Sequence, residues 1–455
     1  MGLFHRDPHA LEPDESDGDD QRQLGDEPPV DESGRRSFED HRDYLLSMVE
    51  PLAPFGMSLL DAWGRTLCED IKGYSDVPPV PVAEVDGYAV RYADVVATKQ
   101  GHPVLLVAGS PRRAVTPDDD DSGDDEPVKR QPATAGQATL VQAGQDMPEG
   151  TDTVVASGDA VTDRRGSRIT VRARVAEGDW VRPMGVEAQD GELLMAAGTV
   201  LDDRRSALLA AAGFDRVMAR PRTRVTVVQV TDSQAEPSDG ARVATYGIHM
   251  ANGMAKADGA TVWRAEIDLT DLSGAHERLS DELVRSDMMM TIGAISDSQI
   301  EPRLVELFEG LGVVNTAEVA MRPGIRHGFG LIGDDDTPLV MLPGDPLSLL
   351  VAYHGFARPV LRKLMGTEPF SHEAMLCFAE RDMDAQPGLT QFVPCRLRQD
   401  GNRYLASEIT GRRHSWLTTL VEADALVMIP QNKHRVYAGE PMACWLLGDQ
   451  RTGIG

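Results

Sequence analysis

The sequence lacks a cysteine motif and an even balance of charge. Its four cysteines (Cys68, Cys377, Cys395, Cys444) are widely spaced, and no Cys-x-x-Cys pair occurs among the 455 residues. This spacing excludes the common zinc and redox motifs and favours a reducing compartment. The net charge is −28, which argues against free binding to nucleic acid and against docking on anionic lipid by charge alone.

Long apolar stretches are also missing. No run of about 18 apolar residues occurs, and the N-terminus has no apolar signal core. The first six residues, Met1 to Arg6, lack the Ser or Thr of a myristoylation site. We therefore expect a cytoplasmic protein that does not insert into a membrane and that reaches one only through a partner.

Much of the acidic excess lies in two runs. The first extends from the N-terminus to about Gly34, and the second contains Asp118 to Asp121 with Asp124, Asp125 and Glu126. Such runs are usually solvated and disordered, and only sometimes are they interaction tails. We predict an acidic disordered tail over residues 1–37 and an acidic loop over 112–130.

One stretch, residues 222–366, has the pattern of an α/β unit. Three apolar segments predict strands at 224–230, 288–292 and 339–342, and each runs into a loop of small residues. The third loop, Pro343 to Ser348, is expected to open a helix. Parallel strands that end in such loops predict a ligand crevice at the carboxyl edge of a sheet.

The rest of the chain predicts smaller modules. Helical spacing is expected from Phe38 to about Leu52, from Ser58 to Ile71 and from Arg204 to Ala212. Short strands are predicted near 103–107, 139–141, 153–156 and 169–175, and again near 375–378, 391–394, 425–430 and 442–446. We expect 38–93 with 175–221 to form a linker or dimerisation subdomain, 94–174 a small β subdomain, and 367–455 a C-terminal β domain.

Four segments carry a family resemblance. They are Ala83 to Val90 (Ala-Glu-Val-Asp-Gly-Tyr-Ala-Val), Ala143 to Val155, Arg322-Pro323-Gly324 with the later Phe329-Gly330, and Pro343 to Ser348. In this order they resemble motifs of the molybdopterin molybdenumtransferases, the MoeA family, which includes the C-terminal domain of gephyrin. The match covers most of residues 38–450.

The resemblance implies a fold and a reaction. The fold is a multidomain α/β homodimer, elongated and built of four subdomains, with a three-layer α/β molybdopterin-binding domain at 222–366 and small β domains. The reaction is the Mg²⁺-dependent insertion of molybdate into adenylylated molybdopterin, with release of AMP. It requires carboxylates for the metal, cations for oxyanions and glycine-rich turns for phosphate.

The sequence departs from the family at these strand ends. Thr231-Asp232-Ser233-Gln234 replaces Thr-Gly-Asp-Glu, so both carboxylates of that motif are lost. Ala294 replaces one of two glycines, and Asp297 adds a negative charge nearby. Ile325 replaces a lysine, so that Arg326 or His327 could supply the missing cation only if the loop is reshaped. Asp345 replaces an asparagine and Ala143 a threonine.

If activity remains, the resemblance points to a small set of residues. The catalytic candidates are Asp86, Glu301, Arg322 and Ser415. The pocket candidates are Thr231, Ser233, Gln234, Gly293, Ser296, Pro343, Gly344, Asp345 and Ser348. A working site would need Glu301, Asp86 and Asp297 for Mg²⁺, and Arg322 and Arg326 for molybdate. Structural roles stay open, because Asp86 suits a tight turn and Asp345 suits a helix N-cap.

Three functions follow from the resemblance. The first is a homodimeric scaffold or adaptor with a degenerate site, because gephyrin anchors receptor tails between its last two subdomains. Actinobacterial gephyrin-like members are associated with the division protein FtsZ and a membrane partner, which would recruit the protein to the membrane or septum. The second is an active molybdopterin molybdenumtransferase. The third is a relative that binds a pterin or nucleotide without turnover.

Overall fold

The computed structural model describes residues 24–96, 102–107, 132–232, 239–295, 300–409 and 416–448, with the backbone alone at 239–245 and 416. The chain forms two compact units. Unit 1 contains the residues up to Ala53 and those from Pro221 onward, and unit 2 contains Pro54–Arg220. The predicted acidic loop 112–130, and the predicted tail as far as residue 23, lie outside the described residues.

The centre of unit 1 is a six-stranded sheet in the order β14-β13-β15-β19-β18-β16. Its parallel strands are β13 (Arg224–Thr231), β14 (Thr261–Asp268), β15 (Met288–Ile292) and β19 (Thr337–Leu342), and its antiparallel strands are β16 (Gly312–Glu318) and β18 (Arg326–Ile332). The three predicted strands and their parallel pairing are confirmed. Both faces of β15 are buried, which explains its unbroken apolar sequence.

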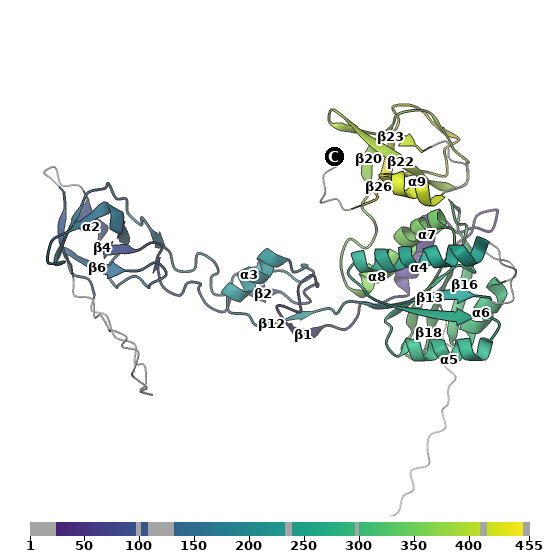
Figure 1. Cartoon of the computed structure of the whole chain (residues 1–455), viewed down its shortest axis with the longest axis horizontal. Helices are drawn as coiled ribbons and strands as arrows, with labels where there is room; N and C mark the ends of the chain where they lie inside the picture. The colour runs from purple at the N-terminus through teal and green to yellow at the C-terminus, as the bar shows by residue number, and fades with distance from the viewer. Residues whose placement is uncertain are drawn as a thin grey trace, which may run out of the picture. The chain divides into compact units, whose positions relative to one another are not determined.

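Helices cover both faces of this sheet (Figure 1). One face packs against α4 (Asp239–Ala257), α7 (Pro346–Ala352), the π-helical turn η2 (Tyr353–Ala357) and α8 (Arg358–Leu364). The other face packs against α5 (Leu272–Leu283) and α6 (Glu301–Glu309). The alternation along the strands decides this division, because Val225 and Val227 face the first layer and Val228 and Val230 the second.

The predicted N-terminal helix is confirmed as α1 (Phe38–Ser47), which belongs to unit 1. The Ser37 hydroxyl caps it by accepting the backbone N–H of Asp40. Phe38 packs within about 5–6 Å, between ring centroids, of Phe356, Phe392 and Trp445. This aromatic cluster joins α1 to the helical layer and to the C-terminal β domain.

The C-terminal β domain has the strand order β17-β22-β23-β20-β26-β24. Its strands are β17 (Met321–Arg322), β20 (Met375–Ala379), β22 (Thr390–Asp400), β23 (Arg403–Glu408), β24 (Ala425–Ile429) and β26 (Pro441–Leu446), with a further pair, β21 (Met383–Asp384) and β25 (Arg435–Val436). Helix α9 (Trp416–Glu422) precedes β24. The four predicted strands are confirmed, and Cys377, Cys395 and Cys444 are buried free thiols in their core.

Unit 2 is built from small sheets. A six-stranded sheet in the order β7-β4-β6-β5-β9-β8 contains β4 (Gly87–Val90), β5 (Val104–Val107), β6 (Gln137–Val141), β7 (Thr153–Ala156), β8 (Ala160–Thr162) and β9 (Arg168–Val171), with α2 (Tyr92–Val95) and η1 (Ser157–Asp159) beside it. The antiparallel pairs are β1 (Phe55–Ser58) with β12 (Arg216–Ala219), β2 (Ile71–Lys72) with β11 (Leu193–Met195), and β3 (Val82–Ala83) with β10 (Val181–Arg182). The predicted alanine-rich helix is α3 (Asp203–Ala211).

The helix predicted from Ser58 to Ile71 is wrong. Residues 55–58 form β1, a series of turns follows, and 71–72 form β2. Leu59, Trp63 and Leu67 mimic helical spacing, but the backbone pairs with β12, about 160 residues further along. Sequence periodicity carries no information on such distant pairing. In the described part of the chain, no helix is long and apolar enough to cross a membrane.

Candidate functional site

Three loops of unit 1 meet at the carboxyl edge of the central sheet. Two of them touch where the backbone N–H of Gly293, after β15, donates to the carbonyl of Leu342 at 3.0 Å. A Cβ on Gly324 would lie 3.0 Å from that of Ser348, so the Arg322–Ile325 loop lies against the start of α7. The structure thus gathers Gly293, Arg322, Pro343, Gly344 and Ser348 around one edge.

The turn after β15 has an unusual backbone. Gly293 has a φ of 84° and Ala294 a φ of 68°, so both adopt the left-handed conformation. Glycine adopts it without strain, whereas alanine pays about 1–2 kcal/mol because its Cβ crowds the carbonyl. The loop therefore keeps a backbone suited to two glycines although one of them is absent.

The acidic residues of this edge are paired with arginines. Asp232 lies 2.7 Å from Arg303, and Glu301 lies 2.6 Å from Arg326. Arg326 also donates to the Thr316 hydroxyl at 2.9 Å. Both carboxylates are largely buried, with 9% and 14% of their side chains exposed. These contacts stabilise the edge and leave little free charge on either acid.

Arg322 differs from these arginines. It is exposed, and it donates to the amide oxygen of Gln386 at 3.1 Å. A neutral amide does not compensate its charge, and no ion pair of Arg322 occurs within the described residues. Arg322 is therefore the cation at this edge that is best placed to hold an anion.

His327 does not supply a second cation. It is buried, and burial lowers its pKa to about 4. The neutral ring donates from Nε2 to the carbonyl of Gly324 at 2.8 Å and so holds the Arg322–Ile325 loop. The ring of His41 lies 6.0 Å away, and burial also lowers its pKa well below the usual value.

Asp345 has the predicted structural role. Its carboxylate accepts the backbone N–H of Ser348 at 2.9 Å, and Pro346 is in the first turn of α7. The carboxylate thus occupies a backbone N–H at the N-terminus of the helix that could otherwise bind an anion. Thr231, at the end of β13, donates its hydroxyl to the carbonyl of Ile267 and so completes a backbone contact.

Asp86 lies in unit 2, whereas the other described candidates belong to unit 1. Its carboxylate accepts the backbone N–H of Ala143 at 2.8 Å. The following Gly87 is obligatory, because a Cβ there would lie 2.2 Å from the carbonyl oxygen of Val155. Asp86 therefore holds the turn between residues 83–90 and 143–144 together, which links two of the segments that carry the resemblance.

The remaining candidates, Ser233, Gln234, Ser296 and Ser415, lie outside the described residues, as does Asp297. Among the described side chains, no group of three His, Cys, Asp or Glu residues is placed to hold a metal. The described carboxylates do not fit Mg²⁺, since Asp232 and Glu301 face arginines and Asp345 caps a helix. Sequence reasoning missed Arg303 and Thr316, although an arginine two residues after Glu301 was a usable signal.

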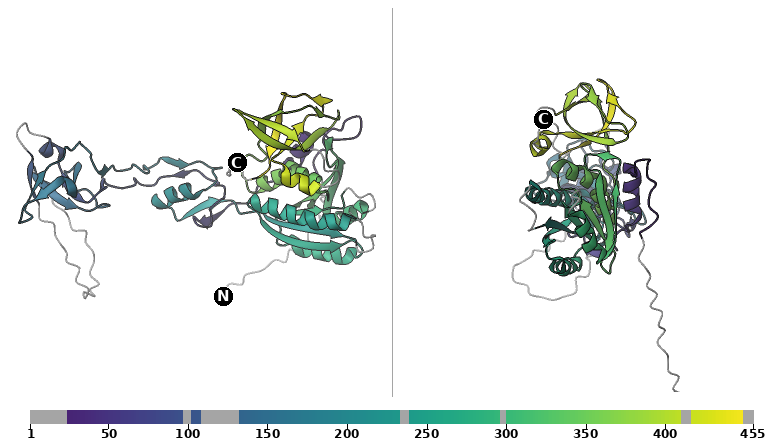
Figure 2. Two further views of the ribbon diagram at one scale, coloured as in Figure 1. Left: turned by 45° about the horizontal axis from the view of Figure 1, so that its top comes forward. Right: turned by 90° about the vertical axis from the view of Figure 1, so that its right-hand side faces the viewer.

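Unit 1 also contains a hollow of about 1290 Å³ on the helical face of the sheet. It is lined by α4, the α7–η2–α8 segment, α9, and the chain on either side of the C-terminal β domain. Figure 2 shows α9, in yellow, over this face. Apolar side chains form one side of this groove (Met250, Met254, Leu350, Leu417, Leu420, Val421 and Leu446).

Polar side chains that alternate with the apolar ones along the same segments also line the groove, and we call them its polar wall. Asp258 accepts the Tyr353 hydroxyl at 2.7 Å and Arg358 Nε at 2.8 Å. His354 keeps a buried Nδ1 that has no partner in the described structure, and burial beside His372 and Arg358 lowers its pKa to about 3. One buried polar atom on this wall thus lacks a hydrogen-bond partner within the described residues.

Comparison with known proteins agrees with this architecture. The family profile "MoeA N-terminal region (domain I and II)" matches residues 36–213, and "MoeA C-terminal region (domain IV)" matches 379–447. Molybdopterin molybdenumtransferase 1 of Mycobacterium tuberculosis H37Rv is 28% identical over 423 residues, 89% of this chain and 97% of the relative. The Bacillus subtilis molybdopterin molybdenumtransferase is 25% identical over 93% of this chain and 94% of the relative.

Solved structures share the fold. Two crystal structures of the molybdopterin biosynthesis MoeA protein of Pyrococcus horikoshii have TM-scores of 0.64 and 0.67 at 22% and 21% identity. They cover 90% and 91% of this chain and 99% and 100% of their own chains. With both terminal regions and the overall architecture matched, the chain belongs to the MoeA family.

Proposed function

We propose that this chain is a molybdopterin molybdenumtransferase, which is the alternative that the sequence left open beside a degenerate scaffold. The observation that carries the proposal is the exposed cation of Arg322, in a loop that lies against the start of α7 at the sheet edge. Relatives with that name match nearly their whole length. They favour the enzyme over the scaffold, and a cytoplasmic setting is part of the proposal.

We assign different roles to the residues at this edge. Arg322 would bind an oxyanion of the substrate, molybdate or phosphate, by a charge-assisted hydrogen bond. Gly293 leaves space for it, because a Cβ built there would meet no heavy atom within 4 Å. His327 positions Arg322 through the Gly324 carbonyl. Mg²⁺, when bound, would neutralise charge on the phosphates, but the described carboxylates do not identify its ligands.

The changes at this edge predict a weak enzyme. Each lost charge-assisted contact costs about 1.5–3 kcal/mol, or roughly tenfold or more in rate. Glu301 and Arg326 neutralise each other, so neither replaces a lost metal ligand or the lost lysine. We expect measurable turnover well below that of relatives that keep the glycines and acids.

The test is AMP release. Purified chain is mixed with adenylylated molybdopterin, Mg²⁺ and molybdate, beside an ordinary family member. Arg322→Ala should lose at least about tenfold in rate, whereas Arg264→Ala, a change of an exposed arginine on β14, should not. No release by the wild-type chain, under conditions in which the family member turns over, would overturn the proposal.

A scaffold or adaptor is the second candidate, and the groove favours it. Its apolar side includes Val421, which is 86% exposed, and Leu417, which is 37% exposed. Such a surface suits a partner tail with apolar anchors. The partner proposed from the resemblance is the tail of FtsZ, together with a membrane protein that would bring the complex to the septum.

Binding of an FtsZ tail peptide tests the scaffold. Val421→Asp should weaken binding at least tenfold, because a charge would enter the apolar side of the groove. Val284→Asp is the matched control, since Val284 is an equally exposed valine (84%) at the end of α5, outside the groove. Equal binding by both variants would remove the groove from the proposal.

We also propose a homodimer. Among the described residues, fourteen of the twenty-one exposed large apolar side chains lie in unit 2, including Leu60 at 92% exposure. Burial of such side chains favours association. Sedimentation should show a dimer for the wild-type chain and a weaker dimer for Leu60→Asp. A wild-type monomer at micromolar concentration would contradict the homodimer.

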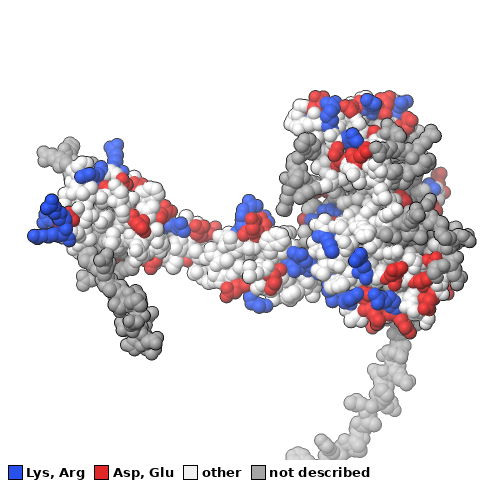
Figure 3. Space-filling model, in the orientation of Figure 1, with Lys and Arg blue, Asp and Glu red and all other residues white. Residues whose placement is uncertain are grey.

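Figure 3 shows acidic and basic side chains interspersed on the visible face of unit 1, with no basic stripe for nucleic acid.

A further inference from the structure

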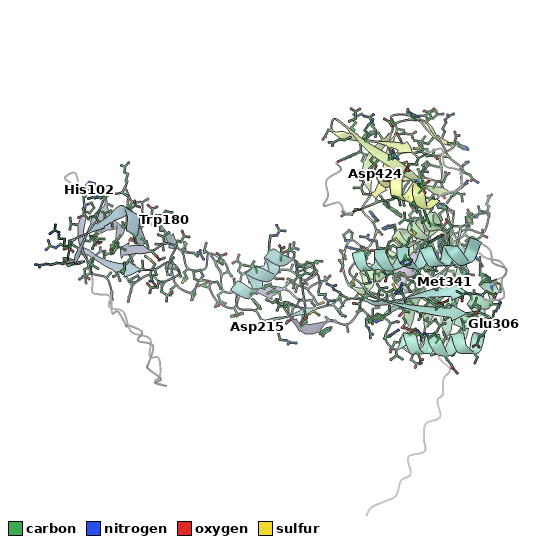
Figure 4. The ribbon with its side chains drawn as sticks, in the orientation of Figure 1. His102, Trp180, Asp215, Glu306, Met341 and Asp424 are labelled. Carbon is green, nitrogen blue, oxygen red and sulfur yellow. The ribbon has the colours of Figure 1, made fainter. Side chains whose placement is uncertain are left out.

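Arg322 is held by the C-terminal β domain as well as by the loops of the central sheet. It ends β17, which lies in the chain between β16 and β18 of the central sheet but pairs in parallel with β22, where its ladder partner is Gln391. Figure 4 labels Met341 on the central sheet and Asp424 in the C-terminal β domain, the two parts of unit 1 that this stretch of chain connects. The cation at the sheet edge thus belongs to a strand of a second sheet.

Among the described residues, the side chain of Arg322 has one hydrogen-bond partner, the side-chain amide of Gln386 in the C-terminal β domain. Arg322 Nη1 donates to Gln386 Oε1 at 3.1 Å. Because a guanidinium can only donate, the oxygen of the amide must face it, and the amide cannot turn over without losing the contact. The contact therefore restricts the direction of the guanidinium and leaves its positive charge uncompensated.

The loop that presents Gln386 is itself held in place. The backbone N–H of Gly388 donates to the carbonyl of Gln431 at 2.7 Å. The side-chain amide of Gln391, a residue that is 8% exposed, donates to the backbone carbonyl of Gln386 at 3.2 Å. A buried amide is stable only when it is hydrogen-bonded, so this bond fixes both residues. The amide of Gln386 therefore has a defined place beside Arg322.

Other arginines of unit 1 pair with carboxylates. Asp232, Glu301 and Asp258 each lie within 2.8 Å of an arginine nitrogen, and only 9–14% of their side chains is exposed. Arg322 contacts a neutral amide instead, which orients a guanidinium without forming an ion pair with it. An oxyanion site requires a cation whose charge is not already paired, and the contact with Gln386 meets that requirement.

We propose that Gln386 is a positioning residue, which orients the Arg322 guanidinium toward an oxyanion of the substrate and leaves its charge free. This inference rests on the proposed transferase function, in which Arg322 binds molybdate or phosphate. Gln391 supports Gln386 from within the β domain. The C-terminal β domain thereby takes part in anion binding at the edge of the central sheet, through a residue that acts on the cation and not on the anion itself.

The experiment compares anion binding with stability in the full chain. Inorganic phosphate and molybdate are titrated separately by calorimetry, so that the two oxyanions are distinguished, and Tm is measured for each variant. Gln386→Glu keeps an oxygen that accepts from Arg322, but it adds a charge that pairs with the cation. The affinity for the bound anion should fall at least about tenfold, whereas Tm should not fall. Gln386→Leu, which removes the acceptor without adding charge, should lose about fivefold in affinity.

Gln399→Glu is the matched control, because Gln399 is another exposed glutamine of the C-terminal β domain, near the opposite end of β22 from Gln391. It should leave anion affinity unchanged. An equal loss in both glutamate variants would overturn the inference. If Arg322→Ala weakens anion binding and Gln386→Glu does not, this inference alone falls. If the wild-type chain binds neither anion, the transferase proposal falls as well, whereas anion binding that Gln386→Glu weakens, without any AMP release, removes the transferase and leaves the inference standing.

Discussion

The carboxyl edge of the central sheet and the groove on its helical face belong to the same unit, yet their charged side chains are arranged differently. At the edge, the acids Asp232 and Glu301 are each matched by an arginine, whereas Arg322 is exposed and pairs with no carboxylate among the described residues. In the groove, polar and apolar side chains lie next to one another along the same segments, and a His354 nitrogen has no hydrogen-bond partner among the described residues.

The difference shows how an inherited site can change without loss of the fold. The edge keeps its loops and its glycine-like backbone, while its charges are used for internal stability. The groove needs no such charges, because burial of apolar area can drive binding there. Substitutions in the two regions should therefore differ in their effects on stability and on activity.

The largest expected effect is at the polar wall of the groove. Asp258→Ala would leave the Tyr353 hydroxyl and the Arg358 cation without their acceptor in a mostly buried site. We expect unit 1 to lose about 3–5 kcal/mol in unfolding free energy, measured by urea denaturation. Asp258→Asn, which still accepts hydrogen bonds, should lose clearly less. A loss below about 1 kcal/mol for Asp258→Ala would mean that this wall is not structural.

Acid should weaken the edge through His327. Its folded pKa, about 4, is below the usual 6.5, so the unfolded chain binds the proton more tightly. Its contribution is therefore fully present above pH 6.5 and is lost as pH falls toward 4, by about 3 kcal/mol in total. Denaturation at a series of pH values should show His327→Gln less sensitive to acid than the wild type. His249→Gln, at an exposed histidine of α4, should follow the wild-type profile.

The Glu301–Arg326 pair should have a smaller effect. Arg326→Met leaves a largely buried carboxylate without its cation and should cost about 2 kcal/mol. Glu301→Gln combined with Arg326→Met should recover part of that loss, because the two changes are coupled. Additive effects in this double-mutant cycle would show that the pair does not stabilise the edge.

The smallest effect on stability is expected at Ala294. Ala294→Gly removes the strain of a left-handed alanine, and we expect a gain of about 0.5–1 kcal/mol. It should also raise AMP release, because the added Cβ is removed from the proposed phosphate space. Ala210→Gly, in helix α3, should instead lose about 1 kcal/mol. The prediction requires the unfolding free energy to rise in Ala294→Gly and to fall in Ala210→Gly.

Local patterns predicted much of the fold. The three parallel strands, the Asp345 cap and helix α1 follow from apolar periodicity and capping chemistry that act over a few residues. The predicted helix at 58–71 failed because β1 depends on a partner strand far along the chain. The division into five segments and the roles of the loop residues outside the described ranges stay predictions.

The sequence by itself determined the family, the strand ends and the residues that the edge lacks. Only the tertiary structure decided what the remaining residues do there. Arg326 meets Glu301 across 25 residues of chain, and Arg303 meets Asp232 across 71. Burial makes His327 neutral and leaves a polar nitrogen of His354 without a partner. Charge pairing and desolvation depend on distances in space, which local sequence patterns do not encode.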